Sequence, residues 1–184
     1  MKKIMIVFFS GCMLLACNSS SSNNQDSVDS AQNVNDSTNV VSDNTSDFAT
    51  EAASGGMMEV QLGKLAQQKA ANPRVKAFGE MMVKDHSKAN DELKAIAARQ
   101  NIALPDSMSN DKKDNMNDLS KKTGKDFDKA YMDMMVDDHK EDIDKFQKAA
   151  QNVKDTAVRA WASNALPVLQ KHLDSAQAIQ QAVK

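Results

Sequence analysis

The pattern of hydrophobic and polar positions divides the chain into three parts. An apolar run over residues 4–15 follows Lys2 and Lys3, and residues 18–46 are then almost entirely Ser, Asn, Asp, Gln and Thr. From residue 47 onward, apolar residues recur at alternating spacings of three and four, which is the period of an amphipathic α-helix. The pattern therefore predicts a leader, a polar segment and a helical domain.

The leader is typical of a bacterial lipoprotein signal peptide covering residues 1–16. Its apolar run is too short to span a bilayer stably. It ends in Leu14-Leu15-Ala16-Cys17, which resembles the lipobox after which signal peptidases cut. In such signals the cysteine becomes a lipid-bearing N-terminus, so Cys17 is the expected membrane anchor. The alternatives are a plain secretory signal or an N-terminal anchor helix. Asn18, in place of Asp, favours the outer over the inner membrane.

The polar segment is expected to be a disordered, acidic tether over residues 17–46. It carries four Asp and no Lys or Arg, and it cannot bury enough apolar area to offset the entropy of ordering it. Residues 47–184 carry as many basic as acidic side chains. Because a nucleic-acid binder needs a basic footprint, no nucleic-acid partner is expected.

Capping and breaking residues predict where the helices of residues 47–184 begin and end. Asn72-Pro73 is a start signal, Leu104-Pro105 ends a helix, and Gly124 closes a polar connector. Four long helices of about 25 residues are typical of an all-α four-helix bundle. The expected ranges are 47–71, 73–101, 125–151 and 155–184, with a short extra helix near 109–121 in the connector.

One ionisable residue interrupts the apolar stripe of each long helix: Glu59, His86, His139 and His172. Counted from the helix ends at about 1.5 Å per residue, all four fall near the same height in mid-bundle. Three imidazoles and a carboxylate suit a divalent transition metal, zinc or copper rather than magnesium or calcium. The pattern therefore predicts a buried metal site. A metal-free polar core, in which the histidines bond Glu59 and one another, explains the same positions.

An internal repeat supports a shared site. Residues 76–86 are echoed by residues 129–139 at a constant offset of 53, and both copies end in Asp-His. Packing explains the repeated apolar residues but not the repeated Asp-His. Asp85 and Asp138 are therefore expected to orient imidazoles of neighbouring helices from outside the ligand set, or else they are solvated surface carboxylates.

Several short motifs are distributed over nearly all of residues 47–184: Glu59 with Leu62-Gly63-Lys64-Leu65-Ala66, Met82-Val83-Lys84-Asp85-His86, Phe127-Asp128 with Tyr131, Asp138-His139, and Leu166-Pro167 with His172-Leu173. In these motifs the chain resembles the bacterial domain of unknown function 4142 family. The resemblance implies an exported protein with a ferritin-like four-helix fold, whose long connector crosses between the second and third helices. It implies no activity, because the function of the family is unknown.

The residues favour a membrane-tethered envelope lipoprotein that binds or buffers a metal without catalysis. A di-iron oxidase of the ferritin kind needs a Glu three residues before a His on each of two helices, and the residues at those positions are Val83, Val136 and Leu169. An enzyme ranks behind the other hypotheses, because the sequence shows no nucleophile–base pair or nucleotide-binding loop. The alternative to metal binding is a structural, interaction or stress-related envelope module whose polar cluster only fixes helix register.

Overall fold

The computed structural model describes residues 25–38 and 41–183, so the predicted signal peptide and Cys17 lie outside the described residues. The prediction of an all-α fold is confirmed, since the described residues form six helices and no strand. In that same part of the chain, no helix is both long and apolar enough to cross a membrane. The helices are α1 (Ser27–Thr38), α2 (Asp43–Lys69), α3 (Pro73–Gln100), α4 (Asn110–Ser120), α5 (Gly124–Asn152) and α6 (Thr156–Gln180).

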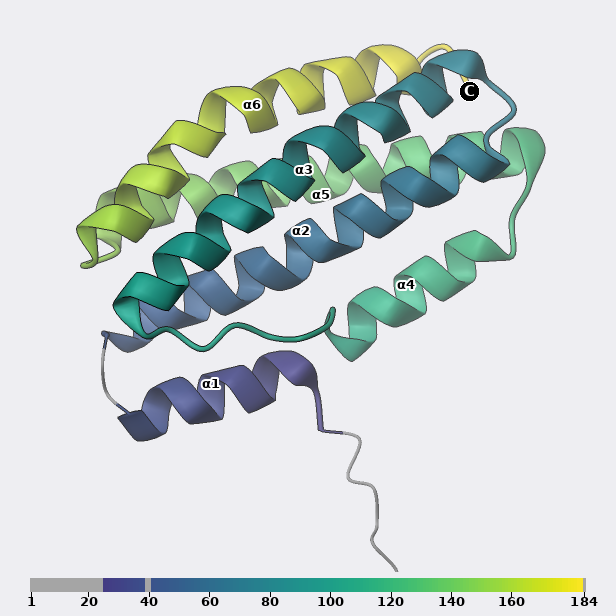
Figure 1. The fold of residues 1–184 in the computed structure, drawn as a ribbon. Coiled ribbons are helices and arrows are strands. Elements are labelled where there is room, and N and C mark those ends of the chain that lie inside the picture. The colour runs from purple at the N-terminus through teal and green to yellow at the C-terminus, as the bar shows by residue number, and fades with distance from the viewer. Residues whose placement is uncertain (1–24, 39–40, 184) are drawn as a thin grey trace, which may run out of the picture.

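The four long helices lie side by side as two antiparallel hairpins (Figure 1). Helix α2 packs along α3 and α5 packs along α6, while contacts of α3 with α6 and of α2 with α5 close the group. The connector after α3 returns with α4 along the outside, so that α5 begins beside the end of α2, where Ala70 and Gly124 form a backbone bridge. Helices α3 and α5 therefore run in one direction, and α2 and α6 run in the other.

Side-chain caps define the starts of three helices, and the cap at Asn72 is the one predicted from the sequence. Asn72 accepts a hydrogen bond from the backbone of the first turn of α3, next to Pro73. Ser109 does the same for α4, and Asp155 for α6. Helices α3, α4 and α5 begin and end within one residue of the expected ranges. The starts of α3 and α4 are fixed by local caps, and α5 begins at Gly124, whose φ of 59° suits glycine.

The prediction that residues 17–46 form a disordered tether is wrong for the part of this segment that the structure describes. Residues 27–38 form α1, and α2 begins at Asp43 rather than near residue 47. The polar side chains of α1 pair with the backbone of the connector between α3 and α4. The Asn35 amide donates to the Ala103 carbonyl at 3.0 Å and accepts from the Ala103 N–H at 2.7 Å.

Two further side chains complete this attachment. The Ser27 hydroxyl accepts from the N–H of Asp106 at 2.9 Å, and the Asp26 carboxylate accepts from the N–H of Asn110, the first residue of α4, at 2.6 Å. The apolar side chains Val28 and Ala31 are buried. Composition did not reveal this order, because the bonding partners lie at least 68 residues away along the chain.

A close approach of α2 and α3 sets the relative height of these two helices. A Cβ on Gly63 would lie 2.6 Å from the Gly79 carbonyl oxygen, and a Cβ on Gly79 would lie 2.7 Å from the Gly63 carbonyl oxygen. Only glycine allows the two backbones to touch here. Glu59 lies one turn before Gly63, and His86 lies two turns after Gly79, so in antiparallel helices both fall on the same side of the crossing.

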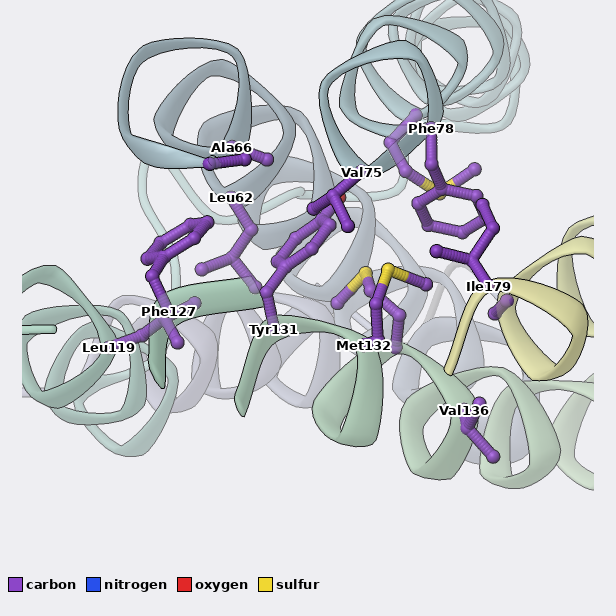
Figure 2. Close-up of a cluster of buried hydrophobic side chains, with 14 of the residues drawn as sticks. Leu62, Ala66, Val75, Phe78, Leu119, Phe127, Tyr131, Met132, Val136 and Ile179 are labelled. Atoms are coloured by element: carbon purple, nitrogen blue, oxygen red, sulfur yellow. The ribbon is translucent and has the colours of Figure 1, made fainter. Parts of the chain in front are cut away.

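Buried apolar side chains form two clusters, one toward each end of the long helices. The first apolar cluster includes the stacked rings of Phe127 and Tyr131 (Figure 2). The second contains Phe146 and Trp161, whose ring centroids lie 5.3 Å apart. Ile143 packs against both clusters. The region where the two clusters meet is therefore deeply buried, which makes any polar group placed there dependent on partners.

We expect Asn35→Ala to lower the free energy of unfolding by about 1–3 kcal/mol, because the Ala103 N–H and carbonyl lose their partner. Asp36→Ala is the matched control, since Asp36 is the next residue of α1 and is exposed. Urea unfolding followed by circular dichroism measures both variants. Equal midpoints for the two would show that the attachment of α1 contributes nothing to stability.

Candidate metal centre

The structure brings Glu59, His86, His139 and His172 together between the two apolar clusters. They come from α2, α3, α5 and α6, one from each long helix. Their exposed fractions are 2%, 6%, 0% and 0%. One ring nitrogen of each histidine lies within 4.8 Å of the corresponding nitrogens of the other two. The predicted convergence of these four residues is therefore observed, and they form one buried polar cluster.

The hydrogen bonds of His139 and His172 determine which ring nitrogens carry a proton. His139 Nδ1 lies 2.8 Å from the carbonyl oxygen of Met135, and His172 Nε2 lies 3.0 Å from Asp85 Oδ2. Carbonyl and carboxylate oxygens only accept, so these two nitrogens donate. In neutral rings, the lone pairs therefore sit on His139 Nε2 and His172 Nδ1, which lie 3.3 Å apart.

Burial keeps all three imidazoles neutral. It lowers the pKa of His86 to about 4 and the pKa of His172 to about 4, and it also lowers the pKa of His139. A proton shared between His139 and His172 is therefore disfavoured at neutral pH, which leaves two lone pairs facing each other. Neutral imidazole is also the form that binds transition metals.

Glu59 and His86 form a second buried contact in the cluster. His86 Nδ1 lies 2.6 Å from Glu59 Oε2. The other carboxylate oxygen, Oε1, lies 3.5 Å from His139 Nε2, which is too far for a hydrogen bond in this geometry. Glu59 Oε1 and His86 Nε2 are buried and have no hydrogen-bond partner among the described residues. Burial raises the pKa of the Glu59 carboxyl, although His139 opposes this shift.

This donor set fits a transition metal ion. Each imidazole keeps one nitrogen for a ligand and places the other beside an acceptor, namely the Met135 carbonyl, Asp85 or Glu59. Metal-binding histidines are oriented in this way. In a tetrahedral site with Zn–N bonds of about 2.0–2.1 Å, two ligating nitrogens lie about 3.3 Å apart. His139 Nε2 and His172 Nδ1 have this separation.

Asp85 and Asp138 occupy equivalent positions in the sequence repeat but have different surroundings. Asp85 bonds His172 of the neighbouring helix α6, as predicted. The prediction that Asp138 orients an imidazole is wrong. Its side chain lines a small cavity of about 60 Å³ with Lys112 and Asp142, and its buried Oδ2 has no hydrogen-bond partner among the described residues.

The order of the helices explains this difference. Because α3 and α5 run in the same direction, the residue before each histidine is turned to the same side of its helix. On α3 this side faces α6 and His172, whereas on α5 it faces α2, which carries Glu59. Burial and then the charge of Glu59 raise the pKa of Asp138 to about 7.

One further acidic residue of the site, Asp142, was not predicted from the sequence. It lies one turn after Asp138 and lines cavities on both sides of α5. Burial and the charge of Glu59 raise the pKa of its carboxyl. Asp142 stands outside the apolar stripe of α5, so hydrophobic periodicity gave no signal. The spacing of four residues from Asp138 is a signal in the sequence, because it places both side chains on one face of the helix.

A larger cavity of about 370 Å³ adjoins the polar cluster. Its buried lining includes Glu59, His86 and His172, while the side chains of Lys88 and Lys171 line it at exposed positions. The polar cluster is therefore not sealed from solvent.

Comparison with known sequences assigns the chain to a family. The model of the family described as a domain of unknown function (DUF4142) matches residues 30–179. The chain belongs to the DUF4142 family. No curated protein and no solved structure matches the chain.

The DUF4142 match begins within α1 and ends in α6, so it includes the whole polar cluster. The family resemblance recognised from the sequence motifs is thereby confirmed. One DUF4142 motif residue is structural, since the buried Asp128 carboxylate accepts from the N–H groups of Ala71 and Asn72 at 3.0 and 2.8 Å. This contact ties α5 to the turn between α2 and α3.

We expect Asp138→Asn to stabilise the metal-free protein at pH 8 but not at pH 4. Folding raises the pKa of Asp138 from 3.8 to about 7. Its contribution to stability is therefore present below pH 4 and is lost as the pH rises through 7. An amide does not ionise. The free energy of unfolding of the variant, relative to that of the wild type, should therefore rise by about 1–3 kcal/mol from pH 4 to pH 8.

Chemical denaturation in the presence of a chelator measures this difference. Asp137→Asn is the matched control, because Asp137 is exposed and pairs only with Lys140 at 3.7 Å. Its effect should stay within about 0.5 kcal/mol at both pH values. The same pH dependence in both variants would contradict the buried environment of Asp138.

Proposed function

We propose that this DUF4142 protein is an exported, lipid-anchored protein whose helical domain binds a divalent transition metal ion. His86, His139 and His172 would supply the imidazole ligands, and Glu59 would balance the charge. The observation that carries the proposal is the pair of facing lone pairs on His139 and His172, in rings whose other nitrogens are already hydrogen-bonded. Zinc or copper(II) suits this nitrogen-rich set better than magnesium or calcium.

The residues of the cluster would each gain from a bound ion. His139 and His172 would direct their lone pairs at a cation instead of at each other, and Glu59 would stay charged beside it, because a nearby positive charge lowers the pKa of a carboxyl group. Since the ligands come from different helices, metal binding would stabilise the folded state. Metal binding would thus be coupled to folding. This coupling supports a role in binding or buffering metal, which requires no chemical reaction at the metal centre.

The helix arrangement supports a ferritin-like four-helix fold for the domain. Two antiparallel hairpins are joined by a long connector that returns along the outside, which leaves α3 and α5 parallel (Figure 1). Ferritin-like di-iron sites also require Glu-x-x-His on two helices. Because Val83 and Val136 occupy those positions, a single ion held by histidines agrees better with this chain.

The leader supports export and lipid attachment at Cys17. Lys2 and Lys3, the short apolar run and the lipobox-like residues 14–17 occur together. Because α1 begins at residue 27, at most nine residues link the lipid-bearing cysteine to the helical domain, a reach of about 30 Å. The domain would therefore be held close to the membrane surface, which we propose is that of the outer membrane.

A structural or interaction module remains the second candidate. The contacts of Asp85 with His172, of His172 with His139, and of Glu59 with His86 join all four long helices without an ion. Such a network can fix helix register by itself. Metal analysis separates the two candidates.

We expect purified protein to bind about one zinc or copper(II) ion per chain and to melt at a higher temperature when loaded. At a free metal concentration 1,000-fold above Kd, the stabilisation is about 4 kcal/mol. The combined change His86→Ala, His139→Ala and His172→Ala should abolish both effects. Equal metal content in the two proteins, with melting unaffected by chelator, would overturn the metal site and favour the structural module.

The sequence repeat supplies a matched pair of single variants for the same experiment. Asp85→Ala removes the acceptor of His172 Nε2 and should weaken metal binding by about 10- to 100-fold. Asp138→Ala changes the equivalent residue of the other copy, whose buried Oδ2 accepts no hydrogen bond from the described residues, so its affinity should stay closer to that of the wild type. Equal losses would show that Asp85 has no orienting role.

We expect Cys17→Ser to abolish incorporation of radiolabelled palmitate and to release the protein from the membrane fraction. Cys12→Ser is the matched control, because it changes the other cysteine of the chain, inside the apolar run of the leader, and should leave both properties intact. Labelling of the Cys17→Ser protein would contradict lipid attachment at this residue.

A further inference from the structure

The 370 Å³ cavity connects the polar cluster with solvent, and its lining has a polar part and an apolar part. His86, His172 and Glu59 form its buried polar part, and the rings of Phe146 and Trp161 with Leu169 form an apolar wall. Lys88 and Lys171 line it at exposed positions. Its volume lies within the range of small-molecule sites, about 300–1,000 Å³. The cavity therefore has room for a compact organic molecule next to the histidines.

One coordination position of the proposed metal ion is available to such a molecule. The ligand atoms that lie close to one another come from the three histidines and do not include Glu59, whose Oε2 is engaged with His86 Nδ1 at 2.6 Å. This carboxylate would therefore orient His86 and balance charge. Three imidazoles then occupy three of the four positions of a tetrahedral ion, as in metal sites that bind an exogenous ligand. His86 is 6% exposed, lines the cavity and has an Nε2 without a hydrogen-bond partner in the described residues. Because His86 and His172 both line the cavity, a fourth ligand would reach an ion held by the histidines from this side.

The charges already present favour a neutral ligand. Glu59 and Asp85 together balance a divalent ion, because the three imidazoles are neutral. An added anion would leave uncompensated negative charge in a buried site, which is costly. Lys88 and Lys171 do not offset this charge at the buried end of the cavity, since both are exposed to solvent, and Lys88 pairs with Glu92 at 3.6 Å. A neutral nitrogen donor would fill the fourth coordination position without adding negative charge to the buried site.

We propose that the cavity binds a neutral nitrogen heteroaromatic compound. Its ring would pack against Trp161 and Phe146, and its nitrogen would take the fourth position at the metal ion held by His86, His139 and His172. This inference rests on the proposed metal-binding function.

Cobalt(II) and 4-phenylimidazole are the probes that test this proposal on the purified protein. Trp161 is the only tryptophan of the chain, so its fluorescence reports occupancy of the cavity, while visible absorption reports the coordination of cobalt. We expect 4-phenylimidazole to change both signals and to bind the cobalt-loaded protein at least about tenfold more tightly than the metal-free protein. Benzoate, the anionic comparison, should bind more weakly.

Ala165→Phe and Ala178→Phe separate the cavity from the rest of α6. Ala165 lines the cavity, so a phenyl ring there should remove 4-phenylimidazole binding and leave cobalt loading intact. Ala178 is exposed on the same helix and does not line the cavity, so its variant should behave like the wild type. Unchanged ligand binding in a folded Ala165→Phe protein would overturn the cavity as the site.

The wild-type measurements stand even where Ala165→Phe fails to fold. Absence of cobalt, zinc and copper(II) binding alike would overturn both this inference and the proposed function. If zinc binds and cobalt does not, the Trp161 fluorescence of the zinc-loaded protein reports 4-phenylimidazole binding. Cobalt binding with no response to 4-phenylimidazole would overturn this inference alone. Benzoate binding as tightly as 4-phenylimidazole would overturn the assignment to a neutral ligand.

Discussion

Three imidazole rings and a carboxylate lie buried where the two apolar clusters meet. The fold is stable only if the polar atoms of these groups find hydrogen-bond partners there. The carbonyl of Met135 and the carboxylates of Asp85 and Glu59 each face one ring nitrogen. This leaves lone pairs of His139 and His172 facing each other at 3.3 Å. A bound metal ion would satisfy these nitrogens without the protonation that burial disfavours, so the proposed function would also stabilise the helical group.

The repeated Asp-His of α3 and α5 shows how one local motif acquires two roles. The two helices run in the same direction, so Asp85 and Asp138 leave them on equivalent sides. The partner helices differ, because α6 offers the imidazole of His172 and α2 offers the carboxylate of Glu59. One aspartate therefore orients a ring, while the other meets a second acid and has a raised pKa. The two aspartates also line different cavities, Asp85 the larger one and Asp138 the smaller one.

Helix α1 is an ordered part of the helical domain, contrary to the prediction of a disordered tether. Its polar residues are ordered because Asn35, Ser27 and Asp26 satisfy backbone groups of the connector that precedes α4. That connector also carries the chain back to the start of α5, so α1 supports the crossing on which the parallel direction of α3 and α5 depends. The family match, which begins at residue 30, agrees with α1 being part of the domain.

Local patterns in the sequence determined the ends of α3, α4 and α5, the buried stripes and the four ionisable residues that interrupt them. These features depend on caps such as Asn72 and Ser109 and on helical periodicity, which act within a few residues. Only the tertiary structure decided the protonated nitrogens of His139 and His172, the surroundings of Asp138, the role of Asp142, the order of α1 and the presence of the cavity. Each of these depends on groups from distant segments, because a buried polar atom takes whichever partner the packing of neighbouring helices brings within reach.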